Sequence, residues 1–262
     1  MNNSPVRVTE QDGLLTVTLT RPAKLNAINP EMTEILWSAA RALGDRDDLR
    51  CMLIAAEGRF FSAGVDLREG AGTRQGDPAT RHQHPGWALR RNARDHHLLY
   101  DEFEALEKPI VLAAHAHCFG GAMEMAMSCD FRFCTPEAEW KLPEIELGVI
   151  AGSGGSSRLT RLMGPGWAKY MAMAGMGVRG EQAKAIGLVH DVFPAESFHA
   201  EVQAFCRRLI SLPAEALGLA KLSVDLSEDV SDRNAQRHID RIINASLSGS
   251  PDNLRLTERF RT

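Results

Sequence analysis

The segment from Lys108 to Asp130 constrains the fold of this chain more than any other. Its apolar run from Pro109 to Ala114 is long enough for one buried strand, and Gly120-Gly121 allows the backbone to turn sharply. The residues from Ala122 to Met127 then favour a helix that carries a single acid, Glu124. A strand, a glycine turn and a helix start direct unpaired N–H groups to one spot, which suits an anion or a developing oxyanion. Taken alone, the segment is also compatible with an ordinary tight connection in which Glu124 points to water.

A second glycine turn, Ala63-Gly64, also follows an apolar strand. Two backbone N–H groups from different loops can converge on one carbonyl oxygen. Glu124 and Glu144 each lie close to a buried, glycine-bounded region, and paired acids at one site can have separated pKa values, so that one serves as acid and the other as base. By spacing alone, Glu102 and Glu146 are competing candidates.

The charge balance argues against nucleic acid or an anionic membrane as partner. The chain of 262 residues has a formal net charge of -4 and shows no basic stripe. No apolar run is long enough for a transmembrane helix, and the first residues lack a signal-peptide pattern. The five cysteines form neither a CxxC pair nor a metal-ligand spacing, so we expect reduced core residues in a cytoplasmic protein.

Hydrophobic periodicity and turn residues predict an α/β chain with a helical C-terminal part. Asp12-Gly13 predicts a hairpin turn, and Asn29 with Pro30 predicts the cap and first residue of a helix that reaches about Leu43. Strands are expected at 6–9, 14–19, 51–56, 109–114, 130–134 and 189–193, an extended segment at 139–144, and helices at 87–107, 156–163, 167–174, 180–186, 196–211, 214–226, 231–247 and 252–260.

Three further organisational features are expected. Residues 68–83 have no periodicity and predict a surface loop. Leu98, Leu99, Phe103 and Leu106 are expected to share the buried face of the helix at 87–107. Because no strand candidate follows 195, we predict a core domain with the site at 1–195 and a helical region at 196–262.

Several weaker motifs have simpler structural explanations. Residues 175–180 fit GxGxxG but follow a helix instead of a strand, so a loop between two helices is favoured over a dinucleotide site. Residues 152–157 are rich in Gly and Ser but lack the lysine of a phosphate loop. His115 and His117 alternate at a strand end without a Cys/His spacing typical of metal sites, which favours hydrogen-bonded structural residues over a zinc site. No GxSxG elbow supports a serine nucleophile.

The motifs occur in an order that resembles the crotonase superfamily, and within it the enoyl-CoA hydratase/isomerase family. The matching segments are 21–22 with 26–27, 60–67, 108–110 through 120–121 to 124 and 129–130, 143–144 with 147–148, 152–159, and 183 with 187–189. This resemblance extends from Val6 to Phe260 and implies an α/β fold, a crotonase-like spiral of ββα turns with a C-terminal α-helical trimerisation region. It also implies a homotrimer or a hexamer made of two trimers.

The resemblance also implies the roles of individual residues. The N–H groups of Ala63 and Gly121 match the family's oxyanion hole, and Glu124 and Glu144 match its two catalytic glutamates. Positions that match the substrate and CoA site are Lys24, Asn26, Ala27, Ser62, Gly64, Val65, Asp66 and Leu67. We expect no metal and no cofactor other than the coenzyme A that forms part of an acyl-CoA substrate.

The expected function is that of a hydro-lyase that adds water across the double bond of a 2-enoyl-CoA. An isomerase that needs only one glutamate, an RNA-binding relative, and a crotonase-fold hydrolase of a non-CoA diketone remain as alternatives. The chain departs from the family at Ala122, where a third glycine is common, at His117 and Phe119, and in a longer segment at 68–100. The acyl group and the choice between trimer and hexamer are left open.

Overall fold

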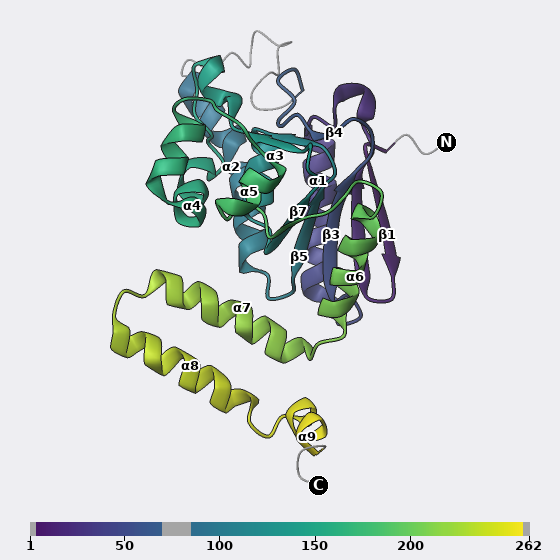
Figure 1. Cartoon of the computed structure of the whole chain (residues 1–262), viewed down its shortest axis with the longest axis vertical. Coiled ribbons are helices and arrows are strands. Elements are labelled where there is room, and N and C mark those ends of the chain that lie inside the picture. Colours follow the sequence, from purple (N-terminus) through teal and green to yellow (C-terminus); the bar gives the residue numbers. More distant parts are fainter. Residues whose placement is uncertain (1–3, 70–84, 259–262) are drawn as a thin grey trace.

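The chain begins with the predicted hairpin. The computed structural model describes residues 4–69 and 85–258, and in it β1 (Val6–Gln11) pairs antiparallel with β2 (Leu14–Leu19) (Figure 1). The turn residues Asp12 and Gly13 both have positive φ, +50° and +82°, which is the backbone conformation of the tightest two-residue hairpin turns. The hairpin prediction is confirmed.

After the hairpin, the chain repeats a unit of two strands and a helix. The first unit is β3 (Cys51–Ala56), β4 (Phe60–Ser62) and α2 (Pro85–Ala105), and the second is β5 (Ile110–Ala114), β6 (His117–Phe119) and α3 (Gly121–Met127). The third is β7 (Phe131–Cys134), β8 (Glu139–Lys141) and α4 (Gly155–Ala172). In each unit the first strand joins one sheet and the second strand joins another, which is the predicted ββα spiral.

The remaining elements connect or extend these units. They are the 3-10 helix η1 (Pro22–Lys24), α1 (Pro30–Asp45), the 3-10 helix η3 (Pro143–Leu147), β9 (Val178–Arg179), α5 (Gly180–Ala185), β10 (Asp191–Val192), α6 (Phe198–Ile210), α7 (Ala214–Asp229), α8 (Arg233–Leu247) and α9 (Pro251–Thr257). Strand order is β1-β2-β3-β5-β7-β10 in the larger sheet and β4-β6-β8-β9 in the smaller sheet. Apart from the β1–β2 and β8–β9 pairs, neighbouring strands are parallel.

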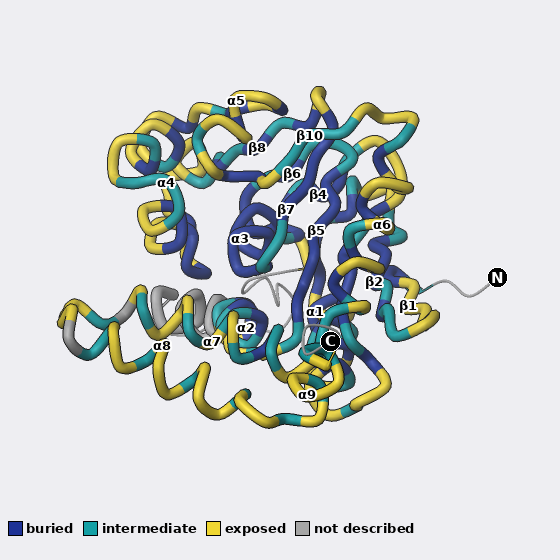
Figure 2. The backbone as a smooth tube through the Cα atoms, turned by 60° about the horizontal axis from the view of Figure 1, so that its bottom comes forward, coloured by how far each residue is buried: buried dark blue, intermediate teal, exposed yellow. Residues whose placement is uncertain are grey.

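The central strands β3 and β5 of the larger sheet are covered on both faces, which explains their apolar residues. In β3, Met52 and Ile54 join the main core, whereas Cys51 and Leu53 pack on the other face against α6. Figure 2 shows the central strands and the whole of α3 as buried. All five cysteines are buried and free, as expected. No helix within the described residues is long and apolar enough to cross a membrane.

The structure corrects some details of the predicted elements. The strand before Gly120 is β6 of the smaller sheet, a short element that the apolar run at 109–114 does not reveal. Leu98 is 43% exposed, because it lies about 100° around the helix from the buried Leu99 and about 140° from the buried Phe103. Pro143 starts a 3-10 helix instead of continuing an extended segment. Most of the predicted loop at 68–83 lies outside the described residues.

The C-terminal helices form two different parts. The helix α6 packs on the larger sheet, while α7, α8 and α9 lie apart from both sheets (Figure 1). Lys221 links α7 to the body through an ion pair of 2.9 Å with Asp130. The helices α7 to α9 thus form a C-terminal arm that is tied to the body through α7.

One asparagine organises the loop that leads into α1. The Asn26 side chain is fully buried, and its Oδ1 accepts the Arg21 N–H at 2.8 Å. Its Nδ2 donates to the carbonyls of Glu57 and Phe60, at 2.7 and 3.0 Å. One side chain thus satisfies three backbone groups from two separate segments of the chain.

Asn26→Ala should therefore destabilise the protein by at least about 3 kcal/mol, since it leaves three backbone groups unpaired. The matched change Asn29→Ala removes the N-cap that accepts the Met32 N–H and one hydrogen bond to the exposed Glu69 carboxylate, and it should cost about 1 kcal/mol. Urea denaturation at one protein concentration measures both. Equal losses for the two variants would contradict this account of the Asn26 side chain.

Candidate active site

Three neighbouring parallel strands bring the candidate site residues together. In the smaller sheet β4 pairs with β6 and β6 pairs with β8, all in the same direction. Because the carboxyl ends of parallel strands lie at one edge of a sheet, the segments that follow them meet there. These segments are 63–66 after β4, 120–124 after β6 and 143–144 after β8.

Two backbone N–H groups, of Val65 and Gly121, lie close together at this edge. The extended segment around Val65 bridges Ile28: the Ile28 N–H donates to Gly64 and the Asp66 N–H donates to Ile28, both at 2.8 Å. Since alternate peptide groups of an extended chain point to opposite sides, the Val65 N–H points away from Ile28. Gly121 is the first residue of α3, so its N–H has no intrahelical acceptor. Within the described residues neither N–H has a hydrogen-bond partner.

The predicted donor Ala63 does not belong to this pair. Its N–H donates to the Leu25 carbonyl at 2.9 Å and is therefore not available to a ligand. The free donor on this loop is Val65, which the sequence places among the substrate-binding residues. The alternation of N–H directions after β4 decides between the two, and it depends on the bridge to Ile28, which no sequence motif reports.

Gly64 and Gly121 allow the two loops to approach closely. Gly64 has φ +95°, and a Cβ on it would lie 2.9 Å from the Phe119 carbonyl and 3.2 Å from the Gly121 nitrogen. A Cβ on Gly121 would lie 3.5 Å from the Val65 nitrogen and only 2.6 Å from the Val65 side chain. Only glycine fits at both positions without a shift of the loops.

The two predicted glutamates flank this pair of N–H groups. A Cβ on Gly120 would lie 2.9 Å from Glu144 Oε1, and a Cβ on Gly121 would lie 3.8 Å from Glu124 Oε2. The structure therefore brings Glu124 and Glu144 to the same dipeptide. Of the competing acids, Glu146 is exposed and pairs with Lys141 at 2.6 Å, and Glu102 lies half-buried on α2.

The Glu124 carboxylate is buried and held at one end only. Its Oε1 accepts the N–H groups of Ser153 and Gly155, at 2.7 and 2.9 Å. Burial, helped by the charge of Glu144, raises the pKa of Glu124 to about 7 against the lowering effect of those two N–H groups and of Arg158. A carboxyl with this pKa can gain or lose a proton near neutral pH.

Glu144 is half-buried on η3, and its Oε2 is buried without a partner among the described residues. Burial also raises the pKa of Glu144 above its ordinary value. A buried, unpaired carboxylate oxygen is energetically costly, which is typical of a group kept for chemistry.

Several predicted substrate-binding residues use their side chains to hold the loops. The Ser62 hydroxyl donates to the Asn26 carbonyl at 2.8 Å, and Asp66 pairs with Arg21 at 2.6 Å. The side chains of Asn26, Ser62 and Asp66 are thus engaged by protein. Lys24 and Leu67 are exposed, and Ala27 is half-buried.

The departures at His117 and Phe119 lie on the face of the smaller sheet that does not join the core. Their rings stack at 5.6 Å, and Phe60 meets both edge-on. His117 Nδ1 accepts the Glu139 N–H, and His115 is hydrogen-bonded to the Gly58 carbonyl. The described residues contain no group of three or more His, Cys, Asp or Glu side chains that could hold a metal ion.

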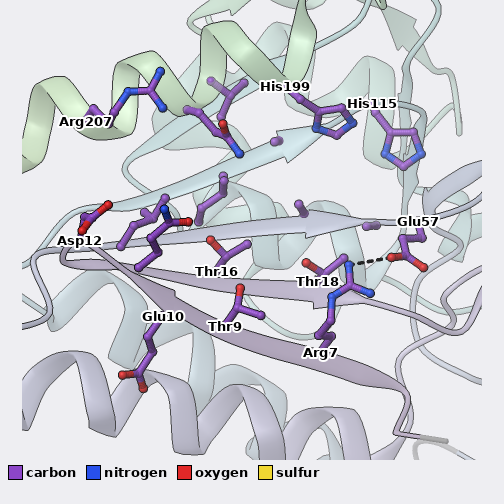
Figure 3. A pocket seen from close by; sticks show the side chains of 18 of the residues that line it. Arg7, Thr9, Glu10, Asp12, Thr16, Thr18, Glu57, His115, His199 and Arg207 are labelled. Carbon is purple, nitrogen blue, oxygen red and sulfur yellow. Dashed lines mark ion pairs between the residues drawn. The ribbon is translucent and has the colours of Figure 1, made fainter. Parts of the chain in front are cut away.

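A separate polar groove lies on the larger sheet, beside α6 (Figure 3). His115 and His199 lie at one end of it and Arg207 at the other, with threonines of β1 and β2 between them. Neither catalytic candidate, Glu124 nor Glu144, lines this groove.

Comparison with known proteins identifies the family. The model of the family described as enoyl-CoA hydratase/isomerase matches residues 9–252. The chain belongs to the enoyl-CoA hydratase/isomerase family. It is 31% identical over 227 residues to 2,3-dehydroadipyl-CoA hydratase of Escherichia coli K12, covering 87% of this chain and 84% of that protein. It is 29% identical to crotonyl-CoA hydratase of Syntrophomonas wolfei, covering 88% of this chain and 83% of that one.

Solved structures agree with this membership. The crystal structure of an enoyl-CoA hydratase from Thermoplasma volcanium GSS1 matches with a TM-score of 0.86 at 26% identity, covering 99% of this chain and 98% of that chain. These matches confirm the predicted crotonase-like fold and the predicted family.

The raised pKa of Glu124 predicts a pH-dependent stability. Between the ordinary pKa of glutamate and about 7, the folded protein binds the proton more tightly than the unfolded chain, so stability falls as pH rises through this interval. Glu124→Gln removes the effect. Relative to the parent protein, this variant should gain on the order of 3 kcal/mol in unfolding free energy at pH 8, and much less at pH 5.

Denaturant unfolding of both proteins at the two pH values measures this difference. Glu146→Gln, which changes an exposed carboxylate nearby, is the matched control and should show no comparable gain. A Glu124→Gln variant that is equally destabilised at both pH values would contradict the raised pKa.

Proposed function

We propose that this protein is an enoyl-CoA hydratase, a hydro-lyase that adds water across the double bond of a 2-enoyl-CoA thioester. The observation that carries the proposal is the pair of free N–H groups, from Val65 and Gly121, flanked by two buried carboxyl groups. The names of the relatives, which include hydratases of crotonyl-CoA and 2,3-dehydroadipyl-CoA, support the same reaction.

In the proposed mechanism the two N–H groups bind the thioester carbonyl oxygen. Hydrogen bonds to this oxygen make the β-carbon electrophilic and stabilise the negative charge that the oxygen gains as water adds. Both donors are backbone groups set in place before the reaction, so they need no reorganisation as charge develops. Gly64 and Gly121 let the two loops approach closely enough for both donors to act on one oxygen.

The two glutamates carry out the proton transfers. Glu124, with a pKa of about 7, takes a proton from the attacking water while the hydroxyl oxygen bonds to the β-carbon. Glu144 delivers a proton to the α-carbon as the enolate collapses. Burial raises the pKa of Glu144, which helps this carboxyl hold the proton until delivery. The reaction is redox-neutral and uses no cofactor beyond the coenzyme A of the substrate.

A double-bond isomerase on the same scaffold is the nearest alternative. It needs one carboxyl group to move a proton between two carbons, whereas hydration needs a base for water and an acid for the α-carbon. The second buried carboxyl, with an unpaired oxygen, favours hydration. The RNA-binding and diketone alternatives have less support, because the chain is acidic and both His115 and His117 are engaged by backbone groups.

The purified protein should hydrate a short 2-enoyl-CoA, measured as loss of the absorbance of the conjugated thioester. Glu144→Gln and Glu124→Gln should each lower kcat by about 10²–10⁴-fold, because each removes one proton-transfer group. Glu146→Gln is the control and should retain activity. Wild-type turnover in Glu144→Gln would contradict its role, and isomerisation of a 3-enoyl-CoA without hydration would favour the alternative.

We also propose that the chain forms a homotrimer, or two such trimers, in the cytoplasm. Apolar side chains are exposed on the arm beyond α6, where a single chain leaves them in water. They are Leu222, Val224 and Leu226 of α7, Ile242 of α8 and Leu254 of α9. Five reduced, buried thiols support a reducing compartment.

Light scattering should therefore give a mass near three or six times the chain mass of 28.8 kDa. Ile242 is 69% exposed on α8, and Ile242→Asp should shift the protein towards monomer by placing a charge in the contact. The exposed Arg255→Asp of α9 is a control for an added acid on the same arm. A monomeric parent protein would contradict the proposal.

A further inference from the structure

The backbone segment that holds Glu124 is itself fixed by a buried cation. Arg158 of α4 is 3% exposed, and its Nη1 donates to the Ser153 carbonyl at 2.9 Å. This carbonyl lies between the two N–H groups, of Ser153 and Gly155, that donate to Glu124 Oε1. The Arg158 side chain therefore contacts the one turn of backbone that sets the position of the carboxylate.

Two carboxylates on another helix hold the guanidinium group in this place. Arg158 Nη2 donates to Asp101 Oδ1 at 2.6 Å and to Glu104 Oε2 at 2.7 Å, and both acceptors belong to α2. We call Asp101, Glu104 and Arg158 the Arg158 cluster. Burying a single cation would be unfavourable, and these two acids compensate its charge.

The close packing around the guanidinium group leaves no space for a side chain on the glycines of the turn. Gly154 has φ +90°, and a Cβ on it would lie 1.9 Å from Arg158 Nη1. A Cβ on Gly155 would lie 2.8 Å from Glu124 Oε1. The glycines thus admit the arginine on one side of the turn and the carboxylate on the other.

We infer that Arg158 is a positioning residue for Glu124: it fixes the turn at 153–155 so that two N–H groups hold Oε1 and leave Oε2 directed towards Gly121. The inference rests on the proposed function of Glu124 as the base for water. Arg158 has no place in the oxyanion pair, and it acts on the reaction only through the turn and through its charge.

The charge of Arg158 gives this role a measurable signature. The groups that act on Glu124 are Glu144 from η3, Tyr100 from α2, Arg158 from α4 and the two N–H groups of the turn. Of these side chains Arg158 is the cation, and it lowers the pKa of Glu124. Loss of the arginine should therefore raise the pKa of Glu124, whereas loss of an ion pair that does not contact the turn at 153–155 should leave it unchanged.

Arg158→Gln removes the charge and the contact with Ser153. We expect kcat for hydration to fall on the order of 10²-fold, the size of effect that misplacement of a catalytic group produces, with KM little changed because the variant does not alter the oxyanion donors. In ¹³C NMR of protein labelled at the glutamate carboxyl carbons, the Glu124 signal, assigned by its absence in Glu124→Gln, should titrate at higher pH than in the parent protein.

Arg161→Gln is the matched control. Arg161 pairs with the same Glu104 and also with Glu228, but its side chain makes no hydrogen bond to the turn at 153–155. This variant should keep the parent kcat and the parent titration of Glu124. Equal changes in the two variants would show that the ion pairs with α2 act only on overall structure, and would overturn the inference.

Arg158→Lys separates charge from geometry and serves if Arg158→Gln does not fold. A lysine keeps the positive charge but cannot donate in the same fork to Ser153 and both acids. We expect a Glu124 titration close to that of the parent protein and a reduced kcat. Parent kcat in this variant would overturn the positioning role. If the parent protein hydrates no enoyl-CoA, the proposed function fails, while the NMR titration still tests the link between Arg158 and Glu124.

Discussion

Parallel pairing of three short strands is the constraint on which the site depends. Alone, β4, β6 and β8 contribute little buried surface, since each has three residues. Held side by side, they place the ends of three ββα units at one edge of the smaller sheet. Each unit then supplies one component: a free N–H after β4, a free N–H with a carboxyl after β6, and a second carboxyl after β8. The spiral thus assembles a composite site from elements that are distant in sequence.

The same edge brings together two carboxyl groups whose negative charges are unfavourable there. Two carboxyl groups lie close together in a region of low solvent access, and burial raises the pKa of both. The protein holds Glu124 by two backbone N–H groups and by a cation bound to the same turn, and among the described residues neither carboxylate has a direct salt bridge. A direct salt bridge to Glu124 would hold its pKa low and make it a weak base. Placing Arg158 one peptide group away keeps the turn rigid and leaves the carboxyl able to accept a proton.

The fold and the two acids could be predicted from the sequence. The directions in which individual N–H groups and side chains point could not. The motif around Ala63-Gly64 identifies the loop, but the choice between the N–H groups of Ala63 and Val65 depends on a bridge to Ile28. Asn26 matches a substrate-binding motif, yet its side chain forms hydrogen bonds with three backbone groups. The short strand β6 has too few residues to show a period. Local patterns report which residues gather at the site, and long-range hydrogen bonds decide which atoms remain free.

The glycine-rich stretch at 152–155 is an anion-binding turn that holds a side chain of the same protein instead of a ligand. Successive N–H groups around a residue with positive φ form a concave anion site, and in nucleotide-binding proteins that anion is a phosphate. Here no lysine accompanies the glycines, and the occupant is the chain's own Glu124 carboxylate, held by Ser153 and Gly155. A phosphate needs an open site and an added positive charge. An internal carboxylate needs a closed turn, and Arg158, packed behind Gly154, closes it. The missing lysine is therefore consistent with an anion site that faces inwards.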